Sequence, residues 1–180
     1  MNWMPSRLPT QRGATLVEVL VSALILGFGL LGLAGLQAKV QAANAEAYQR
    51  AEALLVLQDM ANRIRANGSN AAAYAVTGTL GTDDAQPSSC TGLPIVAKDQ
   101  CEWSALLKGA SEQLGTGKLG GALDARGCIA VAGSAPAVVR ITVAWRAVSP
   151  LAAVPLDCGK GLYGNDAQRR AIAATVTVAS

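Results

Sequence analysis

The stretch that decides the fold runs from Arg12 to Leu36 and reads RGATLVEVLVSALILGFGLLGLAGL. Arg7 and Arg12 lie on the N-terminal side of its apolar run, and no charged residue occurs between Val19 and Ala38. About 20 apolar residues in an α-helix, at a rise of ~1.5 Å each, cover the ~30 Å hydrocarbon layer of a membrane. We therefore expect one membrane span, and the positive-inside rule predicts a cytoplasmic N-terminus with the rest of the chain beyond the membrane.

The composition limits the classes of protein to which the chain can belong. The 180 residues suffice for one domain, and they are 51% hydrophobic but only 15% charged, which is a high apolar load for a soluble protein. The net charge is +3, and it falls to +1 without Arg7 and Arg12, so we expect no nucleic-acid partner. The chain has no histidine, the commonest general base and metal ligand. We therefore expect no enzyme: no catalytic residue, metal, cofactor or small-molecule substrate.

The helical pattern continues beyond the apolar stretch. Apolar residues recur at steps of three and four, no proline interrupts them, and Asn67-Gly68 is a typical helix stop. We expect one helix over residues 14–67, with an apolar half at 14–38 and an amphipathic half at 39–67. The apolar stripe expected on the amphipathic half consists of Ala47, Ala51, Leu54, Leu57, Ala61 and Ile64.

The remaining residues, 68–180, predict a globular head. From Gly68 to Leu123 the sequence is rich in small and polar residues, so we expect a long loop with a short helix near 103–108. Beyond it, apolar and polar residues alternate in short runs, which predicts an antiparallel sheet that packs against the amphipathic half of the helix, an α+β fold. Trp145 lies on the apolar side of its run and is expected in the core. The expected strands are 128–132, 139–146 and 172–178.

Four cysteines lie in the head: Cys90, Cys101, Cys128 and Cys158. They lack the CxxC spacing of zinc sites and redox dithiols, so disulfides outside the cytoplasm are the better interpretation. Four cysteines allow three connectivities. We favour Cys90 with Cys101, which closes a short loop, and Cys128 with Cys158, which ties the start of one strand to the loop after the next.

Two further features have an ordinary structural interpretation. Residues 67–69 form a glycosylation acceptor motif, but helix-stop and turn chemistry explains them more simply. Arg140, Arg146, Arg169 and Arg170 lie on expected strands. So few charges predict a solvated face rather than a site for phosphate or nucleic acid.

The junction at residues 12–18, Arg-Gly-Ala-Thr-Leu-Val-Glu, resembles the class III leader of type IV pilins and pseudopilins. In that family a membrane aspartic peptidase, the prepilin peptidase, cuts after the glycine and methylates the new N-terminus. The resemblance implies that residues 1–13 are a cleaved leader, that the cut falls between Gly13 and Ala14, and that Ala14 is N-methylated. Ala14 stands where the family more often has phenylalanine.

Glu18 is a carboxylate about one helical turn inside the apolar span, where a charge costs ~2.5–3.5 kcal/mol even on lenient scales. Cleavage creates a partner for it, because the α-amino group of Ala14 lies four residues away or on a neighbouring subunit. The resemblance implies that this pairing serves filament assembly, and Thr15 is expected to donate a further hydrogen bond. The alternative is that Glu18 lies at the headgroup interface.

The run from Leu26 to Gln37 looks like that of PilV-type minor pilins. This resemblance implies a minor pilin held in the inner membrane with a periplasmic head, and later present in the pilus at the cell surface. Its partners would be other minor pilins and the major pilin, with which it initiates pilus assembly; a place at the pilus tip fits this role. Four glycines, Gly27, Gly29, Gly32 and Gly35, favour close helix packing and weaken the helix.

Other classes of protein share some or all of these features. A minor pseudopilin of a type II secretion system is built the same way, and a single-span protein with a periplasmic binding domain also has this layout. A secretory signal peptide cut near 43–45 would need an apolar core of only 7 to 15 residues, without a charge such as Glu18. No cysteine lies near the apolar run, which excludes a lipoprotein anchor.

Overall fold

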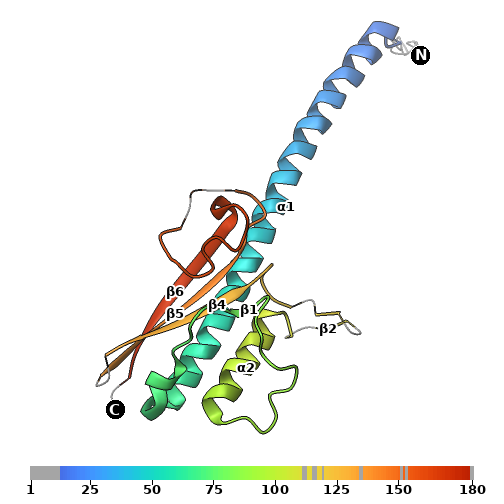
Figure 1. Cartoon of the computed structure of the whole chain (residues 1–180). Coiled ribbons are helices and arrows are strands. Elements are labelled where there is room, and N and C mark those ends of the chain that lie inside the picture. The colour runs from blue at the N-terminus through green and yellow to red at the C-terminus, as the bar shows by residue number, and fades with distance from the viewer. Residues whose placement is uncertain are drawn as a thin grey trace, which may run out of the picture. The chain divides into compact units, whose positions relative to one another are not determined.

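The computed structural model describes residues 13–110, 113–114, 117–118, 120–133, 136–150, 152 and 154–178. The chain divides into two compact units, Met1–Gln41 and Ala42–Ser180. One continuous helix, α1 (Leu16–Ala66), belongs to both (Figure 1). The predicted leader lies outside the described residues, apart from Gly13.

The part of α1 in the second unit packs on the head with a different stripe from the one predicted. Leu57, Ala61 and Ile64 are buried as expected, but Ala47, Ala51 and Leu54 are exposed. Both sides of this helix carry apolar residues, so periodicity alone did not select the side that faces the core. The buried residues of α1 are Ala53, Val56, Leu57, Met60, Ala61 and Ile64.

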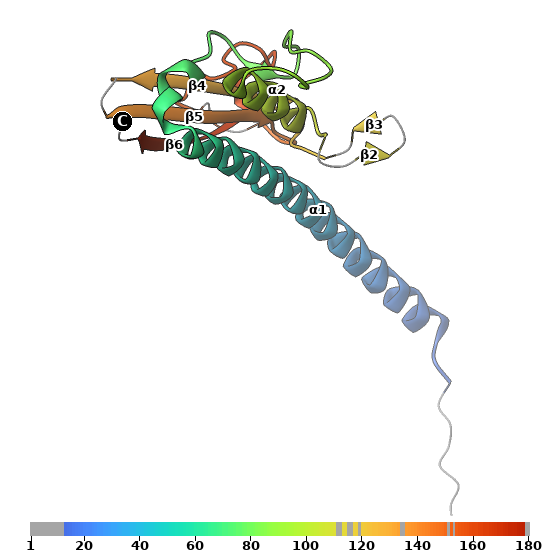
Figure 2. The ribbon, with the colours of Figure 1, turned by 90° about the horizontal axis from the view of Figure 1, so that it is seen from below.

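The head contains a four-stranded sheet in the order β1-β4-β5-β6, antiparallel throughout. Figure 2 shows β4, β5 and β6 side by side. The α+β prediction is confirmed, and so are the three predicted strands, each of which begins two or three residues earlier than expected. The strands are β1 (Leu80–Gly81), β4 (Arg126–Ala132), β5 (Ala137–Arg146) and β6 (Arg169–Val178).

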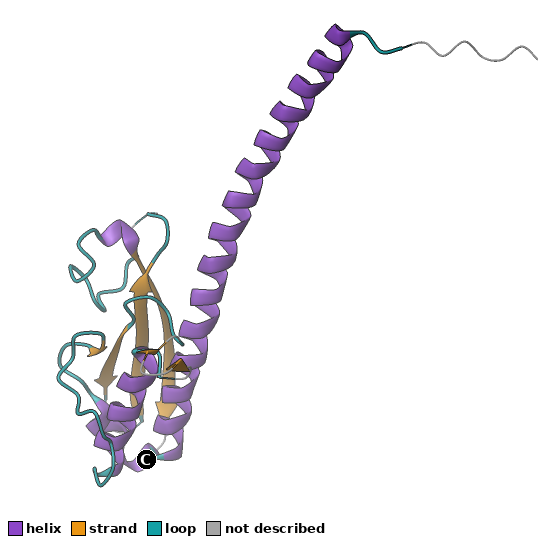
Figure 3. Ribbon diagram, turned by 90° about the vertical axis from the view of Figure 1, so that its right-hand side faces the viewer, coloured by secondary structure: helices purple, strands orange, loops and turns teal. Residues whose placement is uncertain are grey.

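Between Gly68 and Leu123 the short helix expected near 103–108 is the end of a longer helix, but the prediction of a long loop around it was wrong. A 3-10 segment, η1 (Gly68–Tyr74), follows α1, and a second helix, α2 (Ile95–Leu107), contacts β1 and β4. Two short strands, β2 (Gln113–Leu114) and β3 (Gly117–Lys118), form a separate pair. Polar Asp99 and Ser104 lie among the buried residues of α2, so its buried side lacks the apolar periodicity that predicts a helix. Figure 3 shows these helical segments beside the strands.

The core lies on the side of the sheet that the helices cover. Val139, Ile141, Val143 and Trp145 alternate along β5 into one buried cluster with residues of α1 and α2, as predicted for Trp145. Trp103 of α2 is fully buried, and its Nε1–H donates to the carbonyl of Val56 at 2.8 Å. Trp103 packs closely on Gly127 of β4, where a Cβ would lie 2.2 Å from the Trp103 ring.

The other side of the sheet carries a smaller cluster under the loop between β5 and β6, formed by Ala144, Cys158 and Tyr163. A short 3-10 segment, η2 (Asp166–Gln168), closes this loop. Arg169 was predicted on a solvated face, but it is 1% exposed. Its guanidinium donates to the carbonyls of Val154 and Cys158, each at 3.2 Å, and to that of Leu156. Loop carbonyls thus replace water around this arginine.

Candidate functional site

The predicted processing junction lies directly before α1. Gly13, Ala14 and Thr15 are not helical, and the helix begins at Leu16. The Thr15 hydroxyl accepts a hydrogen bond from the Glu18 N–H at 3.3 Å, which is the role of a helix N-cap. The Thr-x-x-Glu pattern of a capping box was the signal in the sequence that pointed to this role. A hydroxyl can accept and donate at the same time, so the donation expected of Thr15 stays a prediction.

Glu18 lies in the first turn of α1 and shares a surface depression with Ala14, Val19, Ser22, Ala23 and Leu26. The Ser22 hydroxyl donates to the main-chain carbonyl of Glu18 at 2.7 Å, so it leaves the carboxylate free. Among residues 13–41, Glu18 forms no ion pair. The structure thus brings together Ala14, whose nitrogen would become the new N-terminus after a cut at Gly13, and a carboxylate that has no ion-pair partner among residues 13–41.

The first unit exposes its apolar side chains. Leu16 is 82% exposed, and Phe28 is 72% exposed. By length and composition, α1 is the helix within the described residues that is long and apolar enough to cross a membrane. No described residue of this unit is buried within the chain. Because burial of such surface is strongly favourable, the helix needs a lipid or protein environment that the chain itself does not supply.

The four glycines of the span lie within this exposed helix. A Cβ placed on Gly27, Gly29, Gly32 or Gly35 would meet nothing within 4 Å. Packing inside the chain therefore does not explain their lack of a side chain. The helix continues through all four, although glycine disfavours helix by about 1 kcal/mol against alanine.

The two disulfides join the pairs that the sequence favours. Cys90 is bonded to Cys101, with Cα atoms 5.7 Å apart, and ties the preceding loop to α2. Cys128 is bonded to Cys158, with Cα atoms 5.8 Å apart, and ties β4 to the loop that follows β5. Such bridges are typical of proteins that fold outside the cytoplasm.

A charged cluster that the sequence did not predict joins α1 to α2. The Arg63 guanidinium is 2.7 Å from Asp59, 3.0 Å from Asp99 and 2.6 Å from Glu102. The Tyr74 hydroxyl donates to Asp99. Burial and this hydrogen bond raise the pKa of Tyr74 to about 12. Two of the Arg63 partners lie more than 30 residues away along the chain, so no local pattern points to them.

A second charged cluster lies beside Tyr163. The Arg126 guanidinium is 2.7 Å from both Asp83 and Asp124, and Arg146 is 2.8 Å from Asp124. Arg126 also lies over the Tyr163 ring, 5.0 Å from its centroid. Each arginine has a carboxylate partner, so the cluster stabilises the head. In the described part of the chain, no group of three or more potential metal-ligating side chains is arranged to hold a metal ion.

Two protein-family models match adjoining parts of the chain. Residues 8–34 match the model of the prokaryotic N-terminal methylation motif, and residues 35–104 match the Tt1218-like model, described as type IV pilin Tt1218. No curated protein and no solved structure gives a significant match. The two family matches adjoin, and the long N-terminal helix with its antiparallel sheet agrees with them. Over residues 8–104 the chain therefore matches type IV pilins and carries the prepilin N-terminal methylation motif.

Proposed function

We propose that this pilin is a minor pilin of the type IV pilus, held in the inner membrane before assembly and then incorporated into the filament. The observation that carries the proposal is the start of α1, where Ala14 and Glu18 border one depression on an exposed apolar helix, and Glu18 has no ion-pair partner among residues 13–41. In a soluble protein this arrangement would be unfavourable, because exposed apolar surface and a charge within an apolar segment both raise the free energy unless a partner covers them.

The prepilin peptidase is the first partner in this proposal. It removes the leader, residues 1–13, between Gly13 and Ala14 and methylates the Ala14 nitrogen. The new cationic N-terminus then pairs with Glu18 of the same chain or of a neighbouring subunit, which offsets the cost of a carboxylate in an apolar environment. The match of residues 8–34 to the methylation motif supports this step.

The proposal assigns a location to each remaining part of the chain. Residues 14–67 form the helix, whose part at 14–38 occupies the membrane and later the filament core, while 39–67 packs on the head. The head, residues 68–180, lies in the periplasm, since Arg7 and Arg12 precede the span and the positive-inside rule keeps such charges in the cytoplasm. The two disulfides support an oxidising compartment for the head.

The minor role rests on the resemblance of Leu26–Gln37 to PilV-type pilins. In this role the chain joins other minor pilins and the major pilin in the complex that initiates assembly, and it stays near the pilus tip. Quantitative mass spectrometry of sheared surface pili tests this role. We expect the chain at a small fraction of the abundance of the major pilin. Equal abundance would refute the minor role, and absence from sheared pili would favour a type II secretion pseudopilin.

Processing has its own test. The intact mass of the membrane-extracted protein should correspond to a chain that starts at a methylated Ala14. A chain that still starts at Met1 in cells with active prepilin peptidase would instead favour a single-span protein with a periplasmic binding domain. A chain that starts at Glu46 would indicate cleavage by signal peptidase after residues 43–45.

A further inference from the structure

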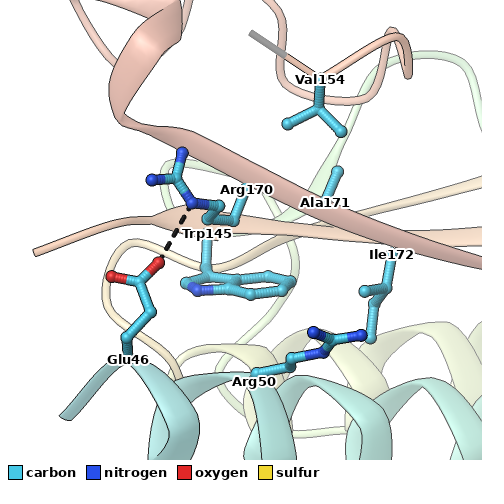
Figure 4. A pocket seen from close by; sticks show the side chains of 7 residues that line it. All are labelled: Glu46, Arg50, Trp145, Val154, Arg170, Ala171 and Ile172. Carbon is cyan, nitrogen blue, oxygen red and sulfur yellow. Dashed lines mark hydrogen bonds and ion pairs between the residues drawn. The ribbon is translucent and has the colours of Figure 1, made fainter. Parts of the chain in front are cut away.

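A pocket of about 370 Å³ lies between α1 and the strands β5 and β6, within the unit Ala42–Ser180. Neither the processing site nor the disulfides take part in it. Its walls are both apolar and charged, as Figure 4 shows. It is lined by Glu46, Arg50, Trp145, Val154, Arg170, Ala171 and Ile172, and we call it the Trp145 pocket.

The apolar part of the Trp145 pocket is the indole ring together with Val154, Ala171 and Ile172. Trp145 is 3% exposed, so the ring is held in place by the core. Its buried Nε1–H has no hydrogen-bond partner among the described residues. In Figure 4 this nitrogen is on the side of the ring that faces Glu46. A buried donor without an acceptor is costly, so a rearrangement that brings an acceptor to it is favoured.

The charged part of the pocket has an excess of positive charge. Arg170 pairs with Glu46 at 3.0 Å and donates to the main-chain carbonyls of Ser149 at 2.8 Å and Ala167 at 3.1 Å. Arg50 lies one turn after Glu46 on α1 and forms no ion pair with any described residue. The pocket therefore offers one guanidinium that is already held and one that is free, against a single carboxylate.

We propose that the Trp145 pocket receives an acidic side chain from a neighbouring pilin subunit, with the carboxylate on Arg50 and its methylene stem against the indole ring. An arginine binds a carboxylate with two parallel hydrogen bonds, and the apolar wall suits the CH₂ groups of Asp or Glu. A phosphate, with a charge of about −1.5 to −2, is less favourable than a single carboxylate because Glu46 lies in the same pocket. The choice of a pilin subunit as the partner rests on the proposed function.

The same step also accounts for the indole N–H. The incoming carboxylate competes with Glu46 for Arg170, which lies across the pocket from Arg50 (Figure 4). A Glu46 carboxylate released from Arg170 is then free to accept from the Trp145 N–H. Binding would thus leave every charge and the buried donor with a partner, which the free subunit does not achieve.

The test uses the full chain in cells that assemble pili, with the photo-crosslinking residue p-benzoylphenylalanine in place of Val154. Crosslinked peptides are identified by mass spectrometry. We expect a peptide of another pilin subunit that contains Asp or Glu close to the crosslink. Arg50→Glu should lower its yield about tenfold or more, as expected for loss of a charge pair, whereas Arg50→Lys should keep most of it. Arg140→Glu, an exposed charge on the opposite side of the sheet, is the matched control and should have no effect.

A charge swap completes the test. Replacing the identified acid by Arg in the partner should restore crosslinking to Arg50→Glu. The proposal is overturned by a phospholipid adduct, by a peptide without an acid, by no adduct at all, or by a yield that Arg50→Glu leaves unchanged. Sheared pili are analysed in parallel, so the two proposals fail separately. Absence from pili refutes the pilus function, while crosslinking at the membrane still decides what the pocket binds.

Discussion

Two parts of the same helix, α1, differ in what buries them. Between residues 16 and 41 the helix carries large apolar side chains that no described residue buries. Between Ala53 and Ile64 it has six residues in the core of the head. The backbone is the same in both parts, but the first part is shaped for lipid or neighbouring helices and the second for a sheet of its own chain.

This difference separates two properties of the protein. The head should owe its stability to the second part, because burial there removes apolar surface from water. Membrane anchoring and filament assembly should depend on the first part, whose partners are outside the chain. Substitutions in one part should therefore leave the property of the other unchanged, and the predictions below test this separation.

The largest effect is expected for Glu18→Ala. Loss of the carboxylate removes the partner of the new Ala14 amine, and the cost of an unpaired charge in an apolar environment, ~2.5–3.5 kcal/mol, lowers incorporation into pili on the order of a hundredfold. Mass spectrometry of sheared pili measures this loss. Intact mass should still show cleavage after Gly13, and the head should unfold at the wild-type urea concentration.

Ser22→Ala is the control for Glu18→Ala, because Ser22 bonds only the main-chain carbonyl of Glu18. It should assemble normally. Wild-type incorporation of Glu18→Ala would refute the charge-pairing role.

In the second part of α1, Ile64→Ala should destabilise the head. Ile64 is 0% exposed, and such a truncation typically lowers the free energy of unfolding by ~2–5 kcal/mol. Leu55→Ala, on the same helix but 61% exposed, should change it by no more than ~0.5 kcal/mol. Urea unfolding of the detergent-solubilised chain, followed by the fluorescence of the buried Trp103 and Trp145, measures both. Equal changes would mean that this part of α1 does not contribute to the core.

Replacing Gly27, Gly29, Gly32 and Gly35 by alanine should stiffen the first part of α1 by up to ~4 kcal/mol in total, at about 1 kcal/mol each. In lipid the helix is already held by the cost of unmet hydrogen bonds, so protein level and cleavage should stay normal. In a filament, neighbouring helices supply other partners, and we expect the wild-type segment to open locally. Pilus number should therefore fall in the variant, with no change in the unfolding of the head. Normal pilus number would show that no yielding segment is needed.

The smallest effect is a pH dependence that belongs to the head alone. Burial by itself would raise the pKa of Asp84, but hydrogen bonds from Lys108, Ser104 and the Gly81 N–H lower it below its usual 3.8. A depressed pKa stabilises the folded state above pH 3.8, and this stabilisation is lost as the pH falls through the folded-state pKa.

Asp84→Asn should thus lower the free energy of unfolding by about 1–2 kcal/mol at pH 7, and the difference from wild type should shrink towards pH 3. Urea unfolding across this pH range measures it. A difference that stays constant with pH would exclude the ionised carboxylate as the cause.

The sequence predicted the first part of α1 better than the head. The apolar span and the methylation motif depend on consecutive residues, and the helix end at Asn67-Gly68 depends on local turn chemistry. The alternation along β5 and β6 was equally local. By contrast, α2 was missed over most of its length, because Asp99 and Ser104 occupy its buried side and are satisfied by Tyr74 and Asp84 from other segments.

The sequence by itself determined the apolar span, the processing motif, the α+β class and the favoured cysteine pairs, since each follows from neighbouring residues or from spacing along the chain. Only the tertiary structure decided which side of α1 faces the sheet, why Arg169 is buried, and that Arg50 and Trp145 border one pocket. These properties depend on groups that folding brings together from distant segments. A buried arginine or an indole without an acceptor is recognised only when its spatial neighbours are known, because the free energy of a polar group depends on what replaces water around it.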